Sequence, residues 1–279
     1  MSLVLLQISD PHFGTEQAHV VAALRDLARA HMPNLVVLSG DITQRATGAQ
    51  FAAARAFVDS LAAPAVMALP GNHDIPLFAL AARLLNPYGR YRKAFGSDLE
   101  PVFESPDCLA IAVNTTRWYR HADGEVSAAQ VDRVAARLMR ASPRQLRVVA
   151  VHQPVTVTLP EDASNLLHGR DRAVARWAEA GADLVLGGHI HLPFVRPLHE
   201  SFPATARTLW AVQAGTAVST RVRSGAPNSV NLIRYVPRPD DDRQCTVERW
   251  DCAADGVRFE LAATQNLRLA STSAPTHGD

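Results

Sequence analysis

Seven side chains that could hold metal ions fall in five short blocks, each directly after an apolar run. Imidazoles and carboxylates without a thiolate suit Zn, Fe, Mn, Co or Ni better than a soft-metal site or an all-oxygen calcium site. Seven candidate ligands are too many for one metal with an open position. They suit two metals that share a bridging carboxylate, an arrangement that supports in-line displacement at phosphorus. The candidate ligands are Asp10, His12, Asp41, Asn72, His152, His189 and His191.

Three of the blocks taken alone have an ordinary structural explanation, whereas Gly-Asn-His-Asp fits a structural or a functional role equally and the i, i+2 histidines of Gly-His-Ile-His can face one centre. Asp10-Pro11-His12 and Gly40-Asp41 are typical turn sequences. His152 alone would more often be a hydrogen-bonded buried histidine. Turn chemistry does not explain five such blocks in one order, each at the end of an apolar run, so we interpret them together as one site.

The apolar runs before these blocks predict strands at 3–8, 35–38, 65–69, 145–151 and 182–186. Apolar residues at helical spacing predict helices at 18–31 and 47–62, between the first three strands. A βαβαβ order predicts a parallel sheet with right-handed crossovers. Ligands of such sheets bind at the carboxyl ends of the strands, where the five blocks lie.

The rest of the chain is less regular. We expect helices at 77–95, interrupted at Asn86-Pro87, at 127–140 and at 168–180, and strands at 101–105 and 108–113. Five further strands between 194 and 261 suggest a second sheet that is mainly antiparallel. We expect a single domain over residues 1–263 and a disordered tail at 264–279, which is rich in Ser, Thr, Ala and Pro.

The composition narrows the class of protein. The 279 residues are 47% hydrophobic and 20% charged, with a formal net charge of +1, so a nucleic-acid polymer is not the expected partner. Three cysteines form no CxxC pair, which favours a reducing compartment, and we expect a cytoplasmic protein. The chain shows no signal peptide and no apolar run of about 18 residues, so no membrane span is expected.

The five blocks resemble the pattern of the calcineurin-like metallophosphoesterase superfamily: Asp-x-His, Gly-Asp, Gly-Asn-His-Asp/Glu, His and Gly-His-x-His. The resemblance covers about residues 3 to 215. "SGDITQRA" and "NPYGRYRKAFGSDLEP" are similar to the bacterial class III cyclic-nucleotide phosphodiesterase branch. One departure is Gln153, where many relatives carry a second histidine.

The resemblance implies an α/β fold, a four-layer αββα sandwich of two mixed sheets flanked by helices. It implies one metal held by Asp10, His12, Asp41 and His191, and another held by Asp41, Asn72, His152 and His189. Manganese and iron are the favoured metals. His73 matches the family's non-ligand histidine beside the phosphate, and we expect Asp74 to orient it.

We therefore expect a phosphodiesterase on small diesters, such as cyclic nucleotides or glycerophosphodiesters. A hydroxide bridging the two metals would attack phosphorus in line, with His73 assisting. The alternatives are a phosphomonoesterase, including a protein phosphatase or nucleotidase, and a non-catalytic scaffold of the same fold. The strand-rich C-terminal part is compatible with a homodimer. As residues that bind the substrate phosphate we nominate Asn114 and Arg45; the arginines also considered are Arg90, Arg92 and Arg117.

Overall fold

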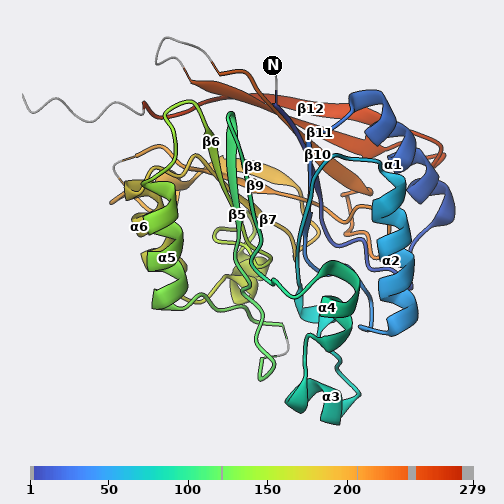
Figure 1. The fold of residues 1–279 in the computed structure, drawn as a ribbon. Coiled ribbons are helices and arrows are strands. Elements are labelled where there is room, and N and C mark those ends of the chain that lie inside the picture. Colours follow the sequence, from blue (N-terminus) through green and yellow to red (C-terminus); the bar gives the residue numbers. More distant parts are fainter. Residues whose placement is uncertain (1–2, 121, 206, 238–242, 272–279) are drawn as a thin grey trace, which may run out of the picture.

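Two six-stranded sheets lie face to face, and helices cover the outer face of each sheet (Figure 1). The computed structural model describes residues 3–120, 122–205, 207–237 and 243–271. The first sheet has the order β12-β11-β10-β1-β2-β3 and the second β4-β5-β6-β7-β9-β8. The predicted four-layer αββα fold class is confirmed. The strands are β1 Leu3–Ile8, β2 Leu35–Ser39, β3 Val66–Leu69, β4 Val102–Ser105, β5 Cys108–Ala112, β6 Leu146–Ala150, β7 Leu184–Gly187, β8 Phe194–Pro197, β9 Trp210–Gln213, β10 Ser229–Tyr235, β11 Gln244–Cys252 and β12 Phe259–Arg268.

The helices flank the sheets in two groups. In Figure 1, α1 and α2 cover the first sheet, α5 and α6 lie on the opposite side against the second sheet, and α3 projects from the body. Two helices begin at capping boxes, Thr47 with Gln50 before α2 and Ser127 with Gln130 before α5, which satisfy free amides of the first turn. The helices are α1 Ala18–His31, α2 Gly48–Ser60, α3 Leu80–Leu85, α4 Gly89–Phe95, α5 Ala128–Leu138 and α6 Arg170–Glu179.

Three apolar cores hold the four layers together. Side chains such as Leu5 and Val37 of the first sheet meet Val148 and Leu186 of the second in the middle core. The alternate residues of the same strands point outward and pack under the helices in two outer cores. Strands covered on both faces are mostly apolar along their length, which is why these strands read as near-continuous apolar runs.

The C-terminal strands do not form the predicted antiparallel second sheet. β8 and β9 join the second sheet, where β9 runs parallel to β7. β10, β11 and β12 instead extend the first sheet, with β10 antiparallel to β1. Local alternation identifies a strand but not its partner, and β1 and β10 are far apart in the chain.

The prediction of a disordered tail from residue 264 is wrong for the part that the structure describes. β12 continues to Arg268, and Leu267 and Leu269 are buried in the middle core. β12 is an edge strand, and its residues 260–266 are exposed to solvent. The polar residues at 264–266 therefore reflect exposure and not a lack of structure. Residues 272–279 lie outside the described residues.

The structure also bears on the cysteines and on the expectation of no membrane span. Cys108, Cys245 and Cys252 are all buried and unbridged. Among the described residues, no helix has the length and apolar character needed to cross a membrane.

Candidate metal centre

Five strand ends from both sheets meet at one edge of the sandwich. β1 leads to Asp10 and His12, β2 to Asp41, β3 to Asn72, β6 to His152, and β7 to His189 and His191. Backbone hydrogen bonds tie the ends together, from Asp10 N to Gly40 O at 3.1 Å and from Gly188 N to His152 O at 2.9 Å. The structure thus brings all seven candidate ligands to one place.

The first cluster of ligand atoms comes from Asp10, His12 and His191, whose atoms lie within 4.8 Å of one another. The Nε2 atoms of His12 and His191 are 3.1 Å apart, and His191 Nε2 is 3.3 Å from Asp10 Oδ1. Asp41 Oδ2 lies 3.8 Å from His12 Nε2. Two imidazole nitrogens that face each other among carboxylate oxygens fit a site for a divalent cation.

The second cluster comes from Asp41, His152 and His189. His152 Nε2 lies 3.3 Å from Asp41 Oδ1 and 3.2 Å from Asn72 Oδ1. His189 Nδ1 is buried and has no hydrogen-bond partner among the residues that the structure describes. A buried polar atom without a partner is costly, and a metal ion at this point would satisfy it. Asp41 also groups with His12 and His73, so its carboxylate faces the first cluster as well, as a bridging carboxylate must.

Hydrogen bonds to the second ring nitrogen orient three of the candidate histidines. His152 Nδ1 contacts Ser39 O at 2.9 Å, and His191 Nδ1 contacts Arg221 O at 2.7 Å. His189 Nε2 lies 3.2 Å from Asn165 Oδ1. Such contacts select which nitrogen faces the metal and hold the ring in place.

The backbone of the site is strained. Eight non-glycine residues of the described chain have positive φ, and five of them are candidate ligands. A left-handed conformation costs a non-glycine residue on the order of 1–3 kcal/mol, and such strain clusters at functional sites. The five are Asp10 (50°), His12 (44°), Asp41 (47°), His189 (73°) and His191 (56°).

Two glycines allow these loops to approach closely. A Cβ at Gly71 would lie 2.0 Å from the backbone nitrogen of Asp41. A Cβ at Gly188 would lie 1.9 Å from Ser9 Oγ. No side chain could make either contact without displacing its neighbour. The glycines of the Gly-Asn-His-Asp and Gly-His-Ile-His blocks therefore allow these loops to pack against the loops of Asp41 and Ser9.

The protonation states of Asp10, Asp41, His12 and His189 suit cation binding. Burial alone would raise the pKa of Asp10, but neighbouring His191 outweighs it and lowers the pKa to about 2. Burial is likewise outweighed at Asp41, where His152 holds the pKa well below its ordinary value. Burial lowers the pKa of His12 to about 3 and that of His189 to about 4. Ionised carboxylates and neutral imidazoles are the forms that ligate metals. At His152 and His191 burial is outweighed by the neighbouring carboxylates, which raise the pKa of His152 to about 9 and also raise that of His191, so a cation must displace protons there.

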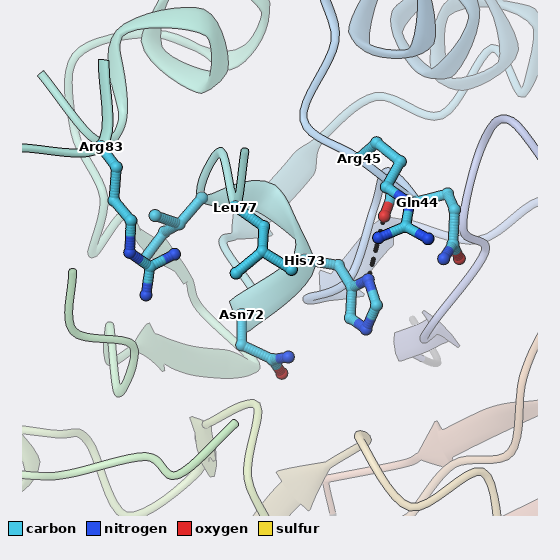
Figure 2. A pocket seen from close by; sticks show the side chains of 7 residues that line it. Gln44, Arg45, Asn72, His73, Leu77 and Arg83 are labelled. Atoms are coloured by element: carbon cyan, nitrogen blue, oxygen red, sulfur yellow. Dashed lines mark hydrogen bonds between the residues drawn. The ribbon is translucent and has the colours of Figure 1, made fainter. Parts of the chain in front are cut away.

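His73 borders the centre. Its ring lies edge-on to that of His12, with centroids 4.9 Å apart, and its backbone amide donates to Asp41 Oδ1 at 2.8 Å. Its Nδ1 lies 3.0 Å from the carbonyl oxygen of Gln44, the dashed contact in Figure 2. A carbonyl only accepts, so Nδ1 carries a proton and Nε2 faces the site.

The expectation that Asp74 orients His73 is wrong. Gln44 makes that contact. Asp74 is buried and its carboxylate accepts from the amides of Ile42, Thr43 and Gly71. Burial, together with the charge of Asp41, raises the pKa of Asp74 to about 6. Asp74 therefore organises the loops and does not touch the His73 side chain.

The two nominated substrate-binding residues have different positions. Arg45 lines a hollow beside His73, together with Asn72, Leu77 and Arg83 (Figure 2). Asn114 does not reach the centre, because its side-chain oxygen accepts from the amide and hydroxyl of Thr116 at 3.1 and 2.7 Å. It lines a separate hollow near Glu100, so the prediction for Asn114 is corrected.

The other arginines considered are engaged elsewhere. Arg90 donates to Ala46 O, Arg92 lies over the ring of Tyr88, and Arg117 contacts Glu125. Gln153, at the position of the departure from the family pattern, is buried and donates to Ala122 O at 3.0 Å. It supports a neighbouring loop.

Sequence reasoning missed Arg221, Gln44 and Asn165. Arg221 Nη1 lies 3.1 Å from His73 Nε2 and 3.1 Å from Gln44 Oε1. The signal for Arg221 was its place in the loop after β9. That loop leaves the same sheet edge as the ligands, which becomes visible only once β9 is known to run parallel to β7.

Comparisons with known proteins agree with this geometry. Residues 3–193 match the calcineurin-like phosphoesterase family. A probable cyclic nucleotide phosphodiesterase of Synechococcus sp. is 29% identical over 206 residues, which cover 70% of this chain and 76% of that protein.

Two solved structures share the fold. Purple acid phosphatase PPD1 from yellow lupin (Lupinus luteus) seeds superposes with a TM-score of 0.72 at 9% identity, over 97% of this chain and 54% of the lupin chain. This chain thus spans about half the length of the lupin enzyme. PhoD superposes with a TM-score of 0.70 at 12% identity, over 99% of this chain and 73% of that one. At such identities the likeness shows the fold alone.

Proposed function

The chain belongs to the calcineurin-like phosphoesterase family, and from this premise we propose that it is a two-metal phosphodiesterase acting on small diesters. Cyclic nucleotides and glycerophosphodiesters are the substrate classes. The observation that carries the proposal is the carboxylate of Asp41, whose two oxygens face two separate clusters of imidazoles. The full set of candidate ligands argues against a non-catalytic scaffold.

The site fits two divalent cations. Asp10, His12, Asp41 and His191 would hold one, and Asp41, Asn72, His152 and His189 the other. Bound there, two such cations supply a hydroxide near neutral pH and neutralise charge on the phosphoryl oxygens. The nitrogen and oxygen ligands suit several metals, of which we propose manganese or iron.

The chain's own groups would position the ester. His73 directs Nε2 to the space beside the centre, where the doubly protonated ring could donate to a phosphoryl oxygen or to the leaving oxygen. Arg45 lines the adjoining hollow and would meet the remainder of the substrate (Figure 2). The preference for diesters is supported by the Synechococcus relative, which is named a probable cyclic nucleotide phosphodiesterase.

The competing function is a phosphomonoesterase, because the metal ligands of the two classes do not differ. A substrate panel with metal-reconstituted protein separates them. It compares cyclic nucleotides, glycerophosphodiesters, bis(4-nitrophenyl) phosphate and 4-nitrophenyl phosphate. We expect a higher kcat/KM for the bis ester than for the monoester with manganese supplied, and the reverse order would favour the monoesterase.

A further inference from the structure

The guanidinium of Arg221 lies against His73. Arg221 belongs to the loop 214–228 between β9 and β10, and its Nη1 is 3.1 Å from His73 Nε2 and 3.1 Å from Gln44 Oε1. Because His73 Nδ1 faces the Gln44 carbonyl, His73 Nε2 accepts from Arg221 Nη1. The positive charge is thus placed at the nitrogen that His73 turns toward the substrate.

The backbone of Arg221 is fixed to the metal centre. Its carbonyl accepts from His191 Nδ1 at 2.7 Å, and its amide donates to Ser219 Oγ at 3.2 Å. Ser219 Oγ contacts Thr216 Oγ1 at 2.8 Å, and that hydroxyl donates to the carbonyl of Asp10 at 2.6 Å. The fixed backbone sets where the Arg221 side chain starts relative to the ligands, and its contacts with His73 and Gln44 place the guanidinium beside them.

Arg221 carries no compensating negative charge. No carboxylate of the described residues forms an ion pair with it, and its Nε and Nη2 make no hydrogen bond to a described residue. Arg223, two residues further on and also partly buried, instead contacts both oxygens of Asp162 at 2.7 and 2.8 Å. The same loop therefore holds one arginine that is neutralised by the protein and one that is left for a ligand.

We propose that Arg221 binds a phosphoryl oxygen of the substrate and is a catalytic residue of this site. The proposal rests on the proposed phosphoesterase function and adds a residue to it. A guanidinium presents paired N–H groups that match two phosphate oxygens, and Nε and Nη2 are free to make that contact. Next to His73, it supplies fixed positive charge where negative charge grows during displacement at phosphorus.

The test uses metal-reconstituted full-length protein and the variants Arg221→Ala and Arg221→Lys. Inorganic phosphate is the probe, and its affinity is measured by calorimetry and by inhibition of bis(4-nitrophenyl) phosphate hydrolysis. Metal content is measured in every sample. Arg172→Ala is the matched control, because it removes one arginine that pairs with Asp132 on the surface.

We expect Arg221→Ala to keep its metals, to bind phosphate about 10- to 100-fold more weakly and to lose a similar factor in kcat/KM. The phosphate affinity and kcat/KM of Arg221→Lys should lie between those of wild type and Arg221→Ala, since a lysine keeps the charge but not the paired N–H groups. Dissolved guanidinium should restore part of the rate of the alanine variant, and Arg172→Ala should stay within about twofold of wild type.

Two outcomes overturn the assignment. One is phosphate binding by Arg221→Ala within about twofold of wild type. The other is metal loss in both variants with unchanged phosphate affinity after reloading, which would make Arg221 only a support of His191. A wild-type protein that hydrolyses no ester of the panel contradicts the proposed function itself. If the wild type is active and Arg221→Ala gives either of the two outcomes above, only the role of Arg221 is contradicted.

Discussion

Thr43 donates two hydrogen bonds to Asp74, from its amide and from its hydroxyl, both at 2.8 Å. The other oxygen of Asp74 accepts from the amides of Ile42 and Gly71 at 3.0 and 2.9 Å. The four donors belong to the loops that follow β2 and β3. Asp74 therefore locks the loop that carries Asp41 against the loop that carries Asn72.

This relationship predicts the effect of Asp74→Asn. An amide offers one oxygen, so its NH₂ must face backbone donors in either orientation. We expect a loss of about 1–3 kcal/mol in the free energy of unfolding and weaker metal retention. The activity that remains should fall by the same factor for all esters, because Asp74 does not touch His73. Urea unfolding, metal analysis and activity on both ester types check this prediction, with the exposed Asp132→Asn as control. A variant of unchanged stability that loses activity only on alkyl esters would contradict it.

Asp41→Ala should empty both metal sites. Asp41 faces His12 through one carboxylate oxygen and His152 through the other. Wild-type protein should bind two metals per chain, and the variant should lose affinity at both positions. Elemental analysis after reconstitution, with Asp132→Ala as control, gives the result. If the variant retains one full equivalent of metal, Asp41 does not bridge the two sites. The same conclusion follows if the wild type binds only one metal per chain.

Asp183→Ala should destabilise the fold without affecting the chemistry. Asp183 is fully buried and accepts from Arg243 Nη1 and Nη2 at 2.8 and 2.7 Å. Removing one partner of a buried pair typically costs about 3–5 kcal/mol, because the other charge is left uncompensated.

The surface variant Asp132→Ala removes a carboxylate from an exposed pair with Arg172 and should cost at most about 1 kcal/mol. Urea unfolding of both variants gives the comparison, together with kcat per metal-loaded molecule. Equal stabilities would show that the Asp183 pair contributes no more than a surface pair.

Much of the centre could be predicted because its residues follow buried parallel strands. A strand such as β2 is buried throughout and apolar from Leu35 to Leu38, so Asp41 shortly after it stands out, and parallel strands deliver their ends to one edge. The positive φ of Asp10 or His189 could not be predicted, because these residue types mostly adopt other conformations.

The errors over site residues that were missed or misplaced from the sequence have a common cause. Arg221 and the support from Asn165 depend on which sheet β9 joins and on how the 160–165 segment packs, and both are decided by contacts distant in sequence. Asn114 also follows a parallel strand, β5, but its side chain turns back to Thr116. Position at a strand end therefore predicts proximity to the edge and not the direction of the side chain.

The role of His73 can be resolved by the leaving group. If His73 only binds phosphoryl oxygens, His73→Ala should slow every substrate by a similar factor. If it also protonates the leaving oxygen, the loss should depend on that oxygen, because nitrophenolate leaves readily without a proton and a ribose or glycerol alkoxide does not. General acid help of this kind is typically worth about 10²–10⁴-fold.

We predict that His73→Ala retains both metals and loses more activity on alkyl diesters than on nitrophenyl diesters. Its Nδ1 is held by Gln44 and its Nε2 accepts from Arg221, so proton transfer to the leaving oxygen requires a second proton on Nε2 and a shift of the Arg221 guanidinium to the phosphoryl group. The measurement is kcat/KM on both ester types for the wild type, for His73→Ala and for the exposed control His199→Ala, with metal content checked. Equal losses across leaving groups would leave His73 as a partner of Arg221 in binding the phosphoryl group, and emptied metal sites would place His73 among the ligands.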